Sequence, residues 1–204
     1  MYESFFGMEH TPFVRDIPAE KLYESDAFRE TLGRLCYVAD RQMFAVVTAD
    51  PGCGKSTLIR RFYKGMLDQL GLEARFLLNY RFDSVSPMAV VLVGQTELWD
   101  NKLKLQRYAA IRQRIDMYCT LPHLDRAETE QYVKSHMDYA ECSQEIFTTK
   151  AMDEIHKASA GIPRMVNRVC EKSLMYAFQQ QKRLIDDYMI KYVVEHEMLG
   201  TVTG

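Results

Sequence analysis

Nine consecutive residues combine two glycines, a lysine and two hydroxyl side chains in one short stretch. In order they are Ala49, Asp50, Pro51, Gly52, Cys53, Gly54, Lys55, Ser56 and Thr57. Gly52 and Gly54 allow the backbone to curl so that several N–H groups point into one concavity, which is how proteins bind phosphate groups. Lys55 can reach the β- and γ-phosphates of a nucleotide, and the Ser56 hydroxyl can hold Mg²⁺. The stretch therefore predicts a phosphate-binding loop for ATP with Mg²⁺, with Ala49 where glycine is commoner.

The segments on either side of this loop have the patterns that the motif requires. Residues 43–48 form a short apolar, β-branched run, which predicts a buried strand. Residues 56–62 carry apolar side chains at helical spacing, so a helix should follow and point its N-terminal N–H groups at the same phosphates. Strand, glycine loop and helix in this order favour nucleotide binding over a glycine turn that happens to precede Lys-Ser.

Composition indicates a globular protein with no general affinity for polyanions. The 204 residues are long enough for one core, or for a core and a small second lobe, and the formal net charge is −2. Five scattered cysteines, with no C-x-x-C pair, are typical of reduced cytosolic thiols. The longest apolar run, near residues 90–93, is too short to cross a bilayer, and the N-terminus lacks the basic region of a signal peptide. We therefore expect a cytoplasmic protein without a membrane span.

The remaining pattern divides the chain into three parts. Residues 1–24 are irregular and aromatic, and predict a strap packed either on the core or beside the nucleotide base. Residues 25–121 predict an α/β lobe with a capped helix to about residue 40, strands near 88–94 and 114–121, and a helical stretch over 101–113. Residues 122–204 are helical throughout, with helix starts near Asp125, Thr148 or Thr149, Pro163 and Asp186.

One element that a phosphate-loop ATPase needs is missing from the pattern. Such enzymes use an apolar strand ending in an acidic residue, which orients Mg²⁺ and polarises water. No such strand lies between Thr57 and Met88. Residues 184–187 imitate one, but a helical pattern begins directly after them, so we interpret them as the cap of the last helix.

Several further motifs resemble those of AAA+ ATPases. More narrowly, the chain resembles the ExeA/GspA-like group, which includes transposition ATPases such as TniB and TnsC. The residues that carry the resemblance are Phe6-Gly7-Met8, Pro12-Phe13, Leu22-Tyr23-x-Ser25, the phosphate loop, Leu77-Leu78-Asn79, Leu92-Val93-Gly94-Gln95-Thr96-Glu97-Leu98, Gln113-Arg114-Ile115 and Gly161-Ile162-Pro163-Arg164. The resemblance covers nearly the whole chain and implies an α/β fold, with a parallel-sheet P-loop NTPase lobe followed by a small all-helical lid.

The resemblance also implies roles for individual residues. Gln95, or with less support Thr96, would be the polar sensor of the γ-phosphate at a strand end. Arg164, at the start of a lid helix, would be the second sensor. Arg114 would be an arginine finger that enters the site of a neighbouring subunit, with Arg112 as the runner-up. The alternative for Arg114 is a surface residue at the end of a helix.

The departure from the family concerns the missing acidic strand. On the family pattern as we read it, that strand should lie between the phosphate-loop strand and the sensor strand. Its loss would leave Val46 and Val91 facing a gap of about two strand spacings, near 10 Å, unless the sheet collapsed. We therefore expect skipped residues and chain breaks at Phe62–Tyr63 and Phe76–Leu77. The alternative is a degenerate protein that binds nucleotide without hydrolysing it.

The resemblance implies an ATPase that forms a ring or filament of identical subunits and regulates DNA transposition. Its partners would be double-stranded target DNA and a transposase. The basic run from Lys102 to Arg114 is a candidate DNA contact, although a solvated helix face is the slightly favoured explanation. One alternative is a secretion-associated ATPase of the ExeA type, which should carry a membrane span and a wall-binding region; we expect neither, because the sequence ends at Gly204. Another is a nucleotide-gated scaffold.

Overall fold

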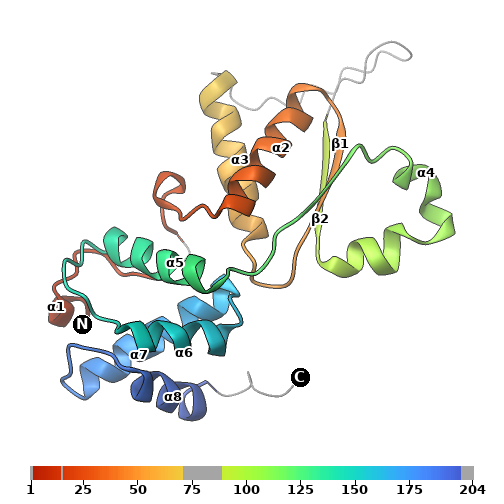
Figure 1. Ribbon diagram of the computed structural model, residues 1–204. Helices are drawn as coiled ribbons and strands as arrows, with labels where there is room; N and C mark the ends of the chain where they lie inside the picture. The colour runs from red at the N-terminus through yellow and green to blue at the C-terminus, as the bar shows by residue number, and fades with distance from the viewer. Residues whose placement is uncertain (1, 15, 71–88, 199–204) are drawn as a thin grey trace. The chain divides into compact units, whose positions relative to one another are not determined.

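The protein consists of two compact units that share one chain. The computed structural model describes residues 2–14, 16–70 and 89–198. An α/β unit comprises Glu24–Pro122, and a helical unit combines Met1–Tyr23 with His123–Gly204 (Figure 1). The N-terminal segment thus belongs with the helical unit rather than with the phosphate loop that follows it in sequence.

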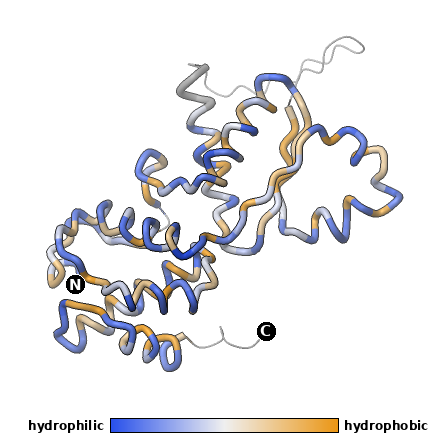
Figure 2. The backbone as a smooth tube through the Cα atoms, in the orientation of Figure 1, coloured by the Kyte–Doolittle hydropathy of each residue, from blue (hydrophilic) through white to orange (hydrophobic). Residues whose placement is uncertain are grey.

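The α/β unit is built on a parallel sheet in the order β2-β1-β3. Its strands are β1 (Phe44–Thr48), β2 (Val90–Gly94) and β3 (Met117–Thr120). The last four residues of β1 are all buried, because a central parallel strand is covered on both faces. Figure 2 shows the corresponding hydrophobic colour along the strands.

Strand β1 pairs directly with β2, so the prediction of a gap between the phosphate-loop strand and the sensor strand is wrong. The register is continuous from Phe44 opposite Val90 to Thr48 opposite Gly94, and Ala45 lies opposite Val91. Strands paired in this way lie about 4.8 Å apart, which leaves no room for another strand between them. Within the described ranges the outer edge of β2 pairs with no strand. An acidic strand could therefore join the sheet only at an outer edge.

Two helices cover one face of the sheet (Figure 1). Helix α2 (Asp26–Asp40) begins after Ser25, whose hydroxyl accepts the N–H of Phe28 at 3.3 Å, as the sequence predicted. Helix α3 (Lys55–Leu70) runs without interruption through residues 62 and 63, so the break expected there is not found. The second expected junction, at residues 76–77, lies outside the described residues, as does the motif at residues 77–79.

Between β2 and β3 the chain carries a segment that we predicted as one helical stretch over residues 101–113. The structure divides it into a π-helix η2 (Leu98–Leu103), a 3-10 turn η3 (Gln106–Tyr108) and a short helix α4 (Ala109–Arg112). The single-helix prediction fails because Leu105 is extended, with ψ of 143°. The Arg112 guanidinium then donates hydrogen bonds to the carbonyls of Leu103 and Lys104, at 3.1 and 2.8 Å, and holds α4 back against the end of η2.

The helical unit contains the helices that the sequence predicted beyond residue 122. They are α5 (Arg126–Tyr139), α6 (Thr149–Ser159), α7 (Pro163–Gln179) and α8 (Asp187–His196), with short α1 (Tyr2–Phe6) and η1 (Ala19–Lys21) before them. Asp125 and Glu128 form a reciprocal capping box at α5. Asp186 accepts the N–H of Met189 at 3.0 Å, which confirms that it caps α8 and does not end an acidic strand.

The aromatic strap completes the core of the helical unit. Phe6 is 1% exposed and Phe13 5% exposed, and both lie in one cluster with buried residues of α5, α6, α7 and α8. Phe5 packs edge-on against Phe178 of α7, with 5.5 Å between ring centroids. Of the two interpretations left open for the strap, packing on the core is therefore the one that the structure supports.

A buried histidine ties the strap to α5 and makes stability depend on pH. His136 Nδ1 accepts the backbone N–H of Phe13 at 3.1 Å, and its ring stacks on that of Phe13. Burial lowers the pKa of His136 from its ordinary 6.5 to about 4. The unfolded chain therefore binds a proton more readily, and stability is complete above the ordinary pKa and is lost as the pH falls towards 4.

We expect the free energy of unfolding to fall by about 2 kcal/mol between pH 7 and pH 5 because of His136. Urea unfolding at both pH values measures this loss. The control is His136→Gln, which keeps an acceptor for the Phe13 N–H but does not titrate, and should lose less. The same pH dependence in both proteins would exclude His136 as the cause.

Gly161 occupies a position that no other residue fits. Its φ is +71°, and a Cβ there would lie 1.9 Å from the carbonyl oxygen of Leu124. That backbone approach is fixed by a hydrogen bond from the Leu124 N–H to the Gly161 carbonyl, at 2.9 Å. We expect Gly161→Ala to cost about 2–5 kcal/mol of stability, from strain plus overpacking.

Denaturant unfolding of Gly161→Ala beside Gly33→Ala tests this expectation. Gly33 lies inside α2, and a Cβ at that position would have no neighbouring atom within 4 Å. Gly33→Ala should therefore be neutral, or stabilising by up to about 1 kcal/mol. Equal effects of the two substitutions on the free energy of unfolding would show that the close approach of Gly161 to Leu124 does not make position 161 intolerant of a side chain.

Candidate functional site

The phosphate loop has the backbone shape that anion binding requires. It connects the end of β1 at Thr48 to the start of α3 at Lys55. Gly52 and Gly54 have φ of 97° and 85°, a left-handed conformation that side chains other than glycine rarely adopt. The first N–H groups of α3 have no intrahelical acceptor, so they and the helix dipole are available to an anion at the loop.

The Lys55 ammonium lies at the mouth of the loop. Its Nζ donates hydrogen bonds to the carbonyl oxygens of Ala49, at 2.7 Å, and Asp50, at 2.9 Å. Phosphate oxygens would compete with these carbonyls for the ammonium. Ser56, the second residue of α3, is solvent-exposed beside it and fits the predicted role of a Mg²⁺ ligand.

Cys53 is part of the same loop, but it is not a reactive thiolate. The side chain is 5% exposed. Burial raises the pKa of its thiol, and the nearby Asp50 charge raises it further. A neutral thiol does not repel phosphates and is a poor nucleophile, so Cys53 acts here as a small packing residue.

The sensor candidates follow β2 directly. Gly94 ends that strand opposite Thr48, and its carbonyl accepts the N–H of Ala49 at 3.3 Å. Gln95 is exposed, whereas the Thr96 hydroxyl donates to Asp50 Oδ1 of the phosphate loop at 3.1 Å. The structure therefore brings Thr96, the less favoured of the two, into contact with the loop.

A hydroxyl cluster beside the loop was not among the residues predicted from sequence. Thr48 Oγ1 lies 2.8 Å from the Tyr118 hydroxyl and 3.4 Å from Thr120 Oγ1, and the Tyr118 ring packs on Trp99. These residues meet because β1 and β3 are paired in register, with Thr48 opposite Thr120. Polar residues at the carboxyl ends of two predicted strands were the signal that could have identified the cluster.

The two arginine-finger candidates have different environments. Arg112 is half-buried and both of its hydrogen bonds go to carbonyls of its own segment, so it holds that segment together. Arg114 is exposed and has no ion pair within the described part of the chain. The turn that carries Arg114 is fixed by Asp116, whose N–H donates to the Phe44 carbonyl and whose carboxylate accepts the Phe44 N–H, each at 2.8 Å.

The basic run over residues 102–114 is only partly available to a ligand. Lys104 is paired with Asp100 at 2.6 Å, and the Arg107 guanidinium lies over the Tyr108 ring. Lys102 and Arg114 are exposed. The run therefore offers fewer unengaged cations than its sequence suggests.

Arg164, the predicted second sensor, is the second residue of α7 and is exposed. Gly161 and Pro163 fix the start of this helix, because glycine permits the left-handed turn and proline suits the first helical position. Arg164 belongs to the helical unit, and the phosphate loop belongs to the α/β unit.

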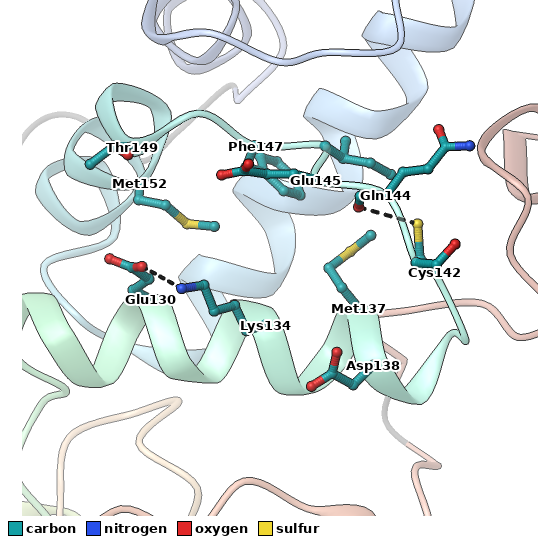
Figure 3. Close-up of a pocket in the computed structure, with 12 residues that line it drawn as sticks. Glu130, Lys134, Met137, Asp138, Cys142, Gln144, Glu145, Phe147, Thr149 and Met152 are labelled. Carbon is teal, nitrogen blue, oxygen red and sulfur yellow. Dashed lines mark hydrogen bonds and ion pairs between the residues drawn. The ribbon is translucent and has the colours of Figure 1, made fainter.

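A hollow of about 410 Å³ in the helical unit contains none of these predicted residues (Figure 3). Met137, Phe147 and Met152 contribute apolar surface to it. On one side Glu130 accepts a hydrogen bond from Lys134 at 2.6 Å. Among the described residues no group of three or more histidine, cysteine or acidic side chains could hold a metal ion, here or elsewhere.

Comparisons with known proteins agree on the fold. The structure is similar to the RuvB Holliday junction branch migration motor of Thermotoga maritima, with a TM-score of 0.57, 15% identity, and coverage of 84% of this chain and 68% of that chain. It is also similar to the ORC2 protein of Aeropyrum pernix, with a TM-score of 0.57, 11% identity, and coverage of 94% and 71%. The fold is that of an AAA+ ATPase. The predicted fold class, an α/β P-loop lobe followed by a helical lid, is confirmed.

The chain also has a relative in sequence. Over 114 residues it is 37% identical to general secretion pathway protein A of Aeromonas hydrophila, a match that covers 56% of this chain and 20% of that protein. This agrees with the ExeA/GspA-like resemblance, although the chain spans only a fifth of that relative's length. No protein-family model matches the chain. No helix within the described ranges has the length and apolar character needed to cross a membrane.

Proposed function

We propose that this protein is an AAA+ ATPase that binds Mg·ATP at Ala49–Thr57 and hydrolyses it as an oligomer. The observation that carries the proposal is the loop itself, in which two left-handed glycines, the first turn of α3 and the Lys55 ammonium converge. Lys55 would bind the β- and γ-phosphates, and Ser56 would hold Mg²⁺. Gln95 or Thr96 would sense the γ-phosphate, and Arg164 would act as the second sensor.

Arg114 gives the reason for proposing an oligomer. It is an exposed arginine that pairs with no carboxylate among the described residues, and it lies on a turn that two hydrogen bonds to Phe44 hold in place. A preordered arginine of this kind is suited to enter the site of a neighbouring subunit and stabilise charge in the transition state. A ring or filament of identical subunits would supply that neighbour.

The finer part of the proposal is a cytoplasmic role in DNA transposition, with double-stranded DNA and a transposase as partners. It is supported by the motifs shared with the TniB and TnsC type. Structures of DNA-associated proteins are also similar in fold, including Drosophila ORC bound to DNA, with a TM-score of 0.54 and 12% identity. The exposed cations Lys102 and Arg114 are candidate phosphate contacts.

Two alternatives each rest on one observation. The 37% identity to general secretion pathway protein A favours a secretion-associated ATPase. A nucleotide-gated scaffold is favoured by the sheet, since no strand ending in an acidic Mg²⁺ ligand lies within the described ranges. Such a strand would have to join at an outer edge of the sheet, beside β2 or β3.

The rate of phosphate release from ATP by the purified chain, measured with and without duplex DNA, distinguishes between these three functions. Turnover that rises with protein concentration and with DNA supports the oligomeric DNA-dependent ATPase. Turnover that DNA leaves unchanged, together with no ATP-dependent co-sedimentation with DNA, favours the secretion type. Tight ATP binding without turnover identifies the scaffold.

A further inference from the structure

One side of α7 carries a row of exposed cations followed by an aromatic ring. Arg168, Lys172 and Tyr176 are spaced four residues apart, so they are neighbours along one side of the helix. Arg168 and Lys172 are exposed, and Tyr176 is half-buried. The row therefore leads from two positive charges to an aromatic surface within two helical turns.

No ion pair with a described carboxylate neutralises these two cations, in contrast to four other cations of the helical unit. Arg126, Lys134, Lys157 and Lys191 all form ion pairs. Within the described residues Arg168 and Lys172 form none. Glu171 follows Arg168 by three residues on α7 and is therefore its neighbour on the helix surface, but the two side chains form no ion pair. Both cations of the row therefore remain available to an anionic ligand.

The aromatic end of the row continues onto α8, which packs against α7 (Figure 1). Tyr176 stacks on Tyr192, with 4.7 Å between ring centroids and 28° between planes. Tyr192 stacks in turn on His196, at 4.3 Å and 18°. His196 Nδ1 donates a hydrogen bond to the Tyr192 carbonyl at 3.0 Å, which fixes the ring. The exposed His196 ends this ladder, so one of its faces is available for a further ring.

Unpaired cations next to a stacked aromatic ladder are the two features that a single nucleic-acid strand requires. Cations attract its phosphates, and aromatic rings stack on its unpaired bases. A duplex keeps its bases stacked inside and offers no base face to the ladder. We propose that the α7–α8 surface, formed by Arg168, Lys172, Tyr176, Tyr192 and His196, binds a single strand of nucleic acid with a base stacked on His196.

This surface belongs to the helical unit, whereas the phosphate loop and Arg114 belong to the α/β unit. The inference therefore does not rest on ATP hydrolysis, and it is tested without nucleotide. The measurement is fluorescence anisotropy of a labelled 20-mer of thymidine, across a salt series, with the 204-residue chain. A 20-mer duplex and an abasic strand of the same length are the matched ligands.

The charge variant is Arg168→Gln with Lys172→Gln, and its control is Lys134→Gln with Lys157→Gln, which removes the same charge from other parts of the helical unit. Losing two phosphate contacts should lower affinity for the strand by about tenfold or more and reduce the slope of log K against log salt by about 1.4. The control should change neither quantity.

The stacking variant is His196→Ala, and it should weaken binding of the thymidine strand by roughly five- to hundredfold while leaving the abasic strand unchanged. His196→Tyr should restore binding. The inference is overturned if the unmodified chain does not bind the strand, if both charge variants behave alike, or if His196→Ala affects the abasic strand equally. A preference for duplex over single strand would also overturn it.

Discussion

Arg114→Ala should abolish ATP hydrolysis and leave ATP binding intact. An arginine finger supplied by a neighbouring subunit is worth on the order of 10³–10⁵ in rate, because it stabilises charge that develops only in the transition state. The structure favours Arg114 over Arg112 for this role, since Arg112 is bonded to the carbonyls of Leu103 and Lys104 whereas Arg114 is exposed. Steady-state phosphate release at saturating ATP measures the loss.

A mixing experiment shows whether the arginine acts on another subunit. Arg114→Ala protein keeps an intact phosphate loop, and Lys55→Ala protein keeps an intact finger, so mixed assemblies should recover part of the activity at shared interfaces. Arg107→Ala, which removes an exposed arginine of the same segment, should retain nearly full turnover. If the mixture stays inactive although both variants assemble, Arg114 is not the finger.

The second large effect concerns Lys55→Ala. The ammonium is already positioned at the loop by the carbonyls of Ala49 and Asp50, so phosphate oxygens need only replace those two acceptors. Charge-assisted hydrogen bonds to phosphate are worth about 1.5–3 kcal/mol each. We therefore expect ATP affinity to fall by at least about tenfold while the fold survives, as measured by titration with a fluorescent ATP analogue.

Lys104→Ala is the matched control for Lys55→Ala. It removes the same charge from the α/β unit, but Lys104 is an exposed partner of Asp100 rather than part of the loop. Its ATP affinity should equal that of the unmodified protein. Equal affinity of all three proteins would refute the assignment of the phosphate loop.

The local elements of the fold were predictable because each depends on nearby residues. Glycines at positions 52 and 54 with lysine at 55 identify the loop, and Ser25, Asp125 and Asp186 each cap the helix that the sequence assigned to them. Such features follow from hydrogen bonds within a few residues. Strand and helix patterns around the loop were correct for the same reason.

Features that depend on distant residues were harder to predict. The predicted neighbour of β1 was wrong because strand order is set by the crossover connections between strands. The strands' own sequences do not reveal the order, since β1 and β2 are both apolar. The contact of Thr96 with Asp50 depends on that order, so the sequence favoured Gln95 over Thr96 as the sensor. The prediction of one helical stretch over residues 101–113 was wrong because the chain is extended at Leu105, and the bonds from Arg112 to carbonyls nine and eight residues earlier hold the two parts together.

Calorimetric titration of the 204-residue chain with Mg·ATP, Mg·ADP and AMP tests the central claim most directly. In a phosphate loop the β-phosphate is held by the backbone N–H groups and by Lys55, whereas AMP lacks that phosphate. We predict one site per chain that binds ATP and ADP and has at least about tenfold lower affinity for AMP. Equal affinity for all three nucleotides, or no binding of ATP, would contradict the account.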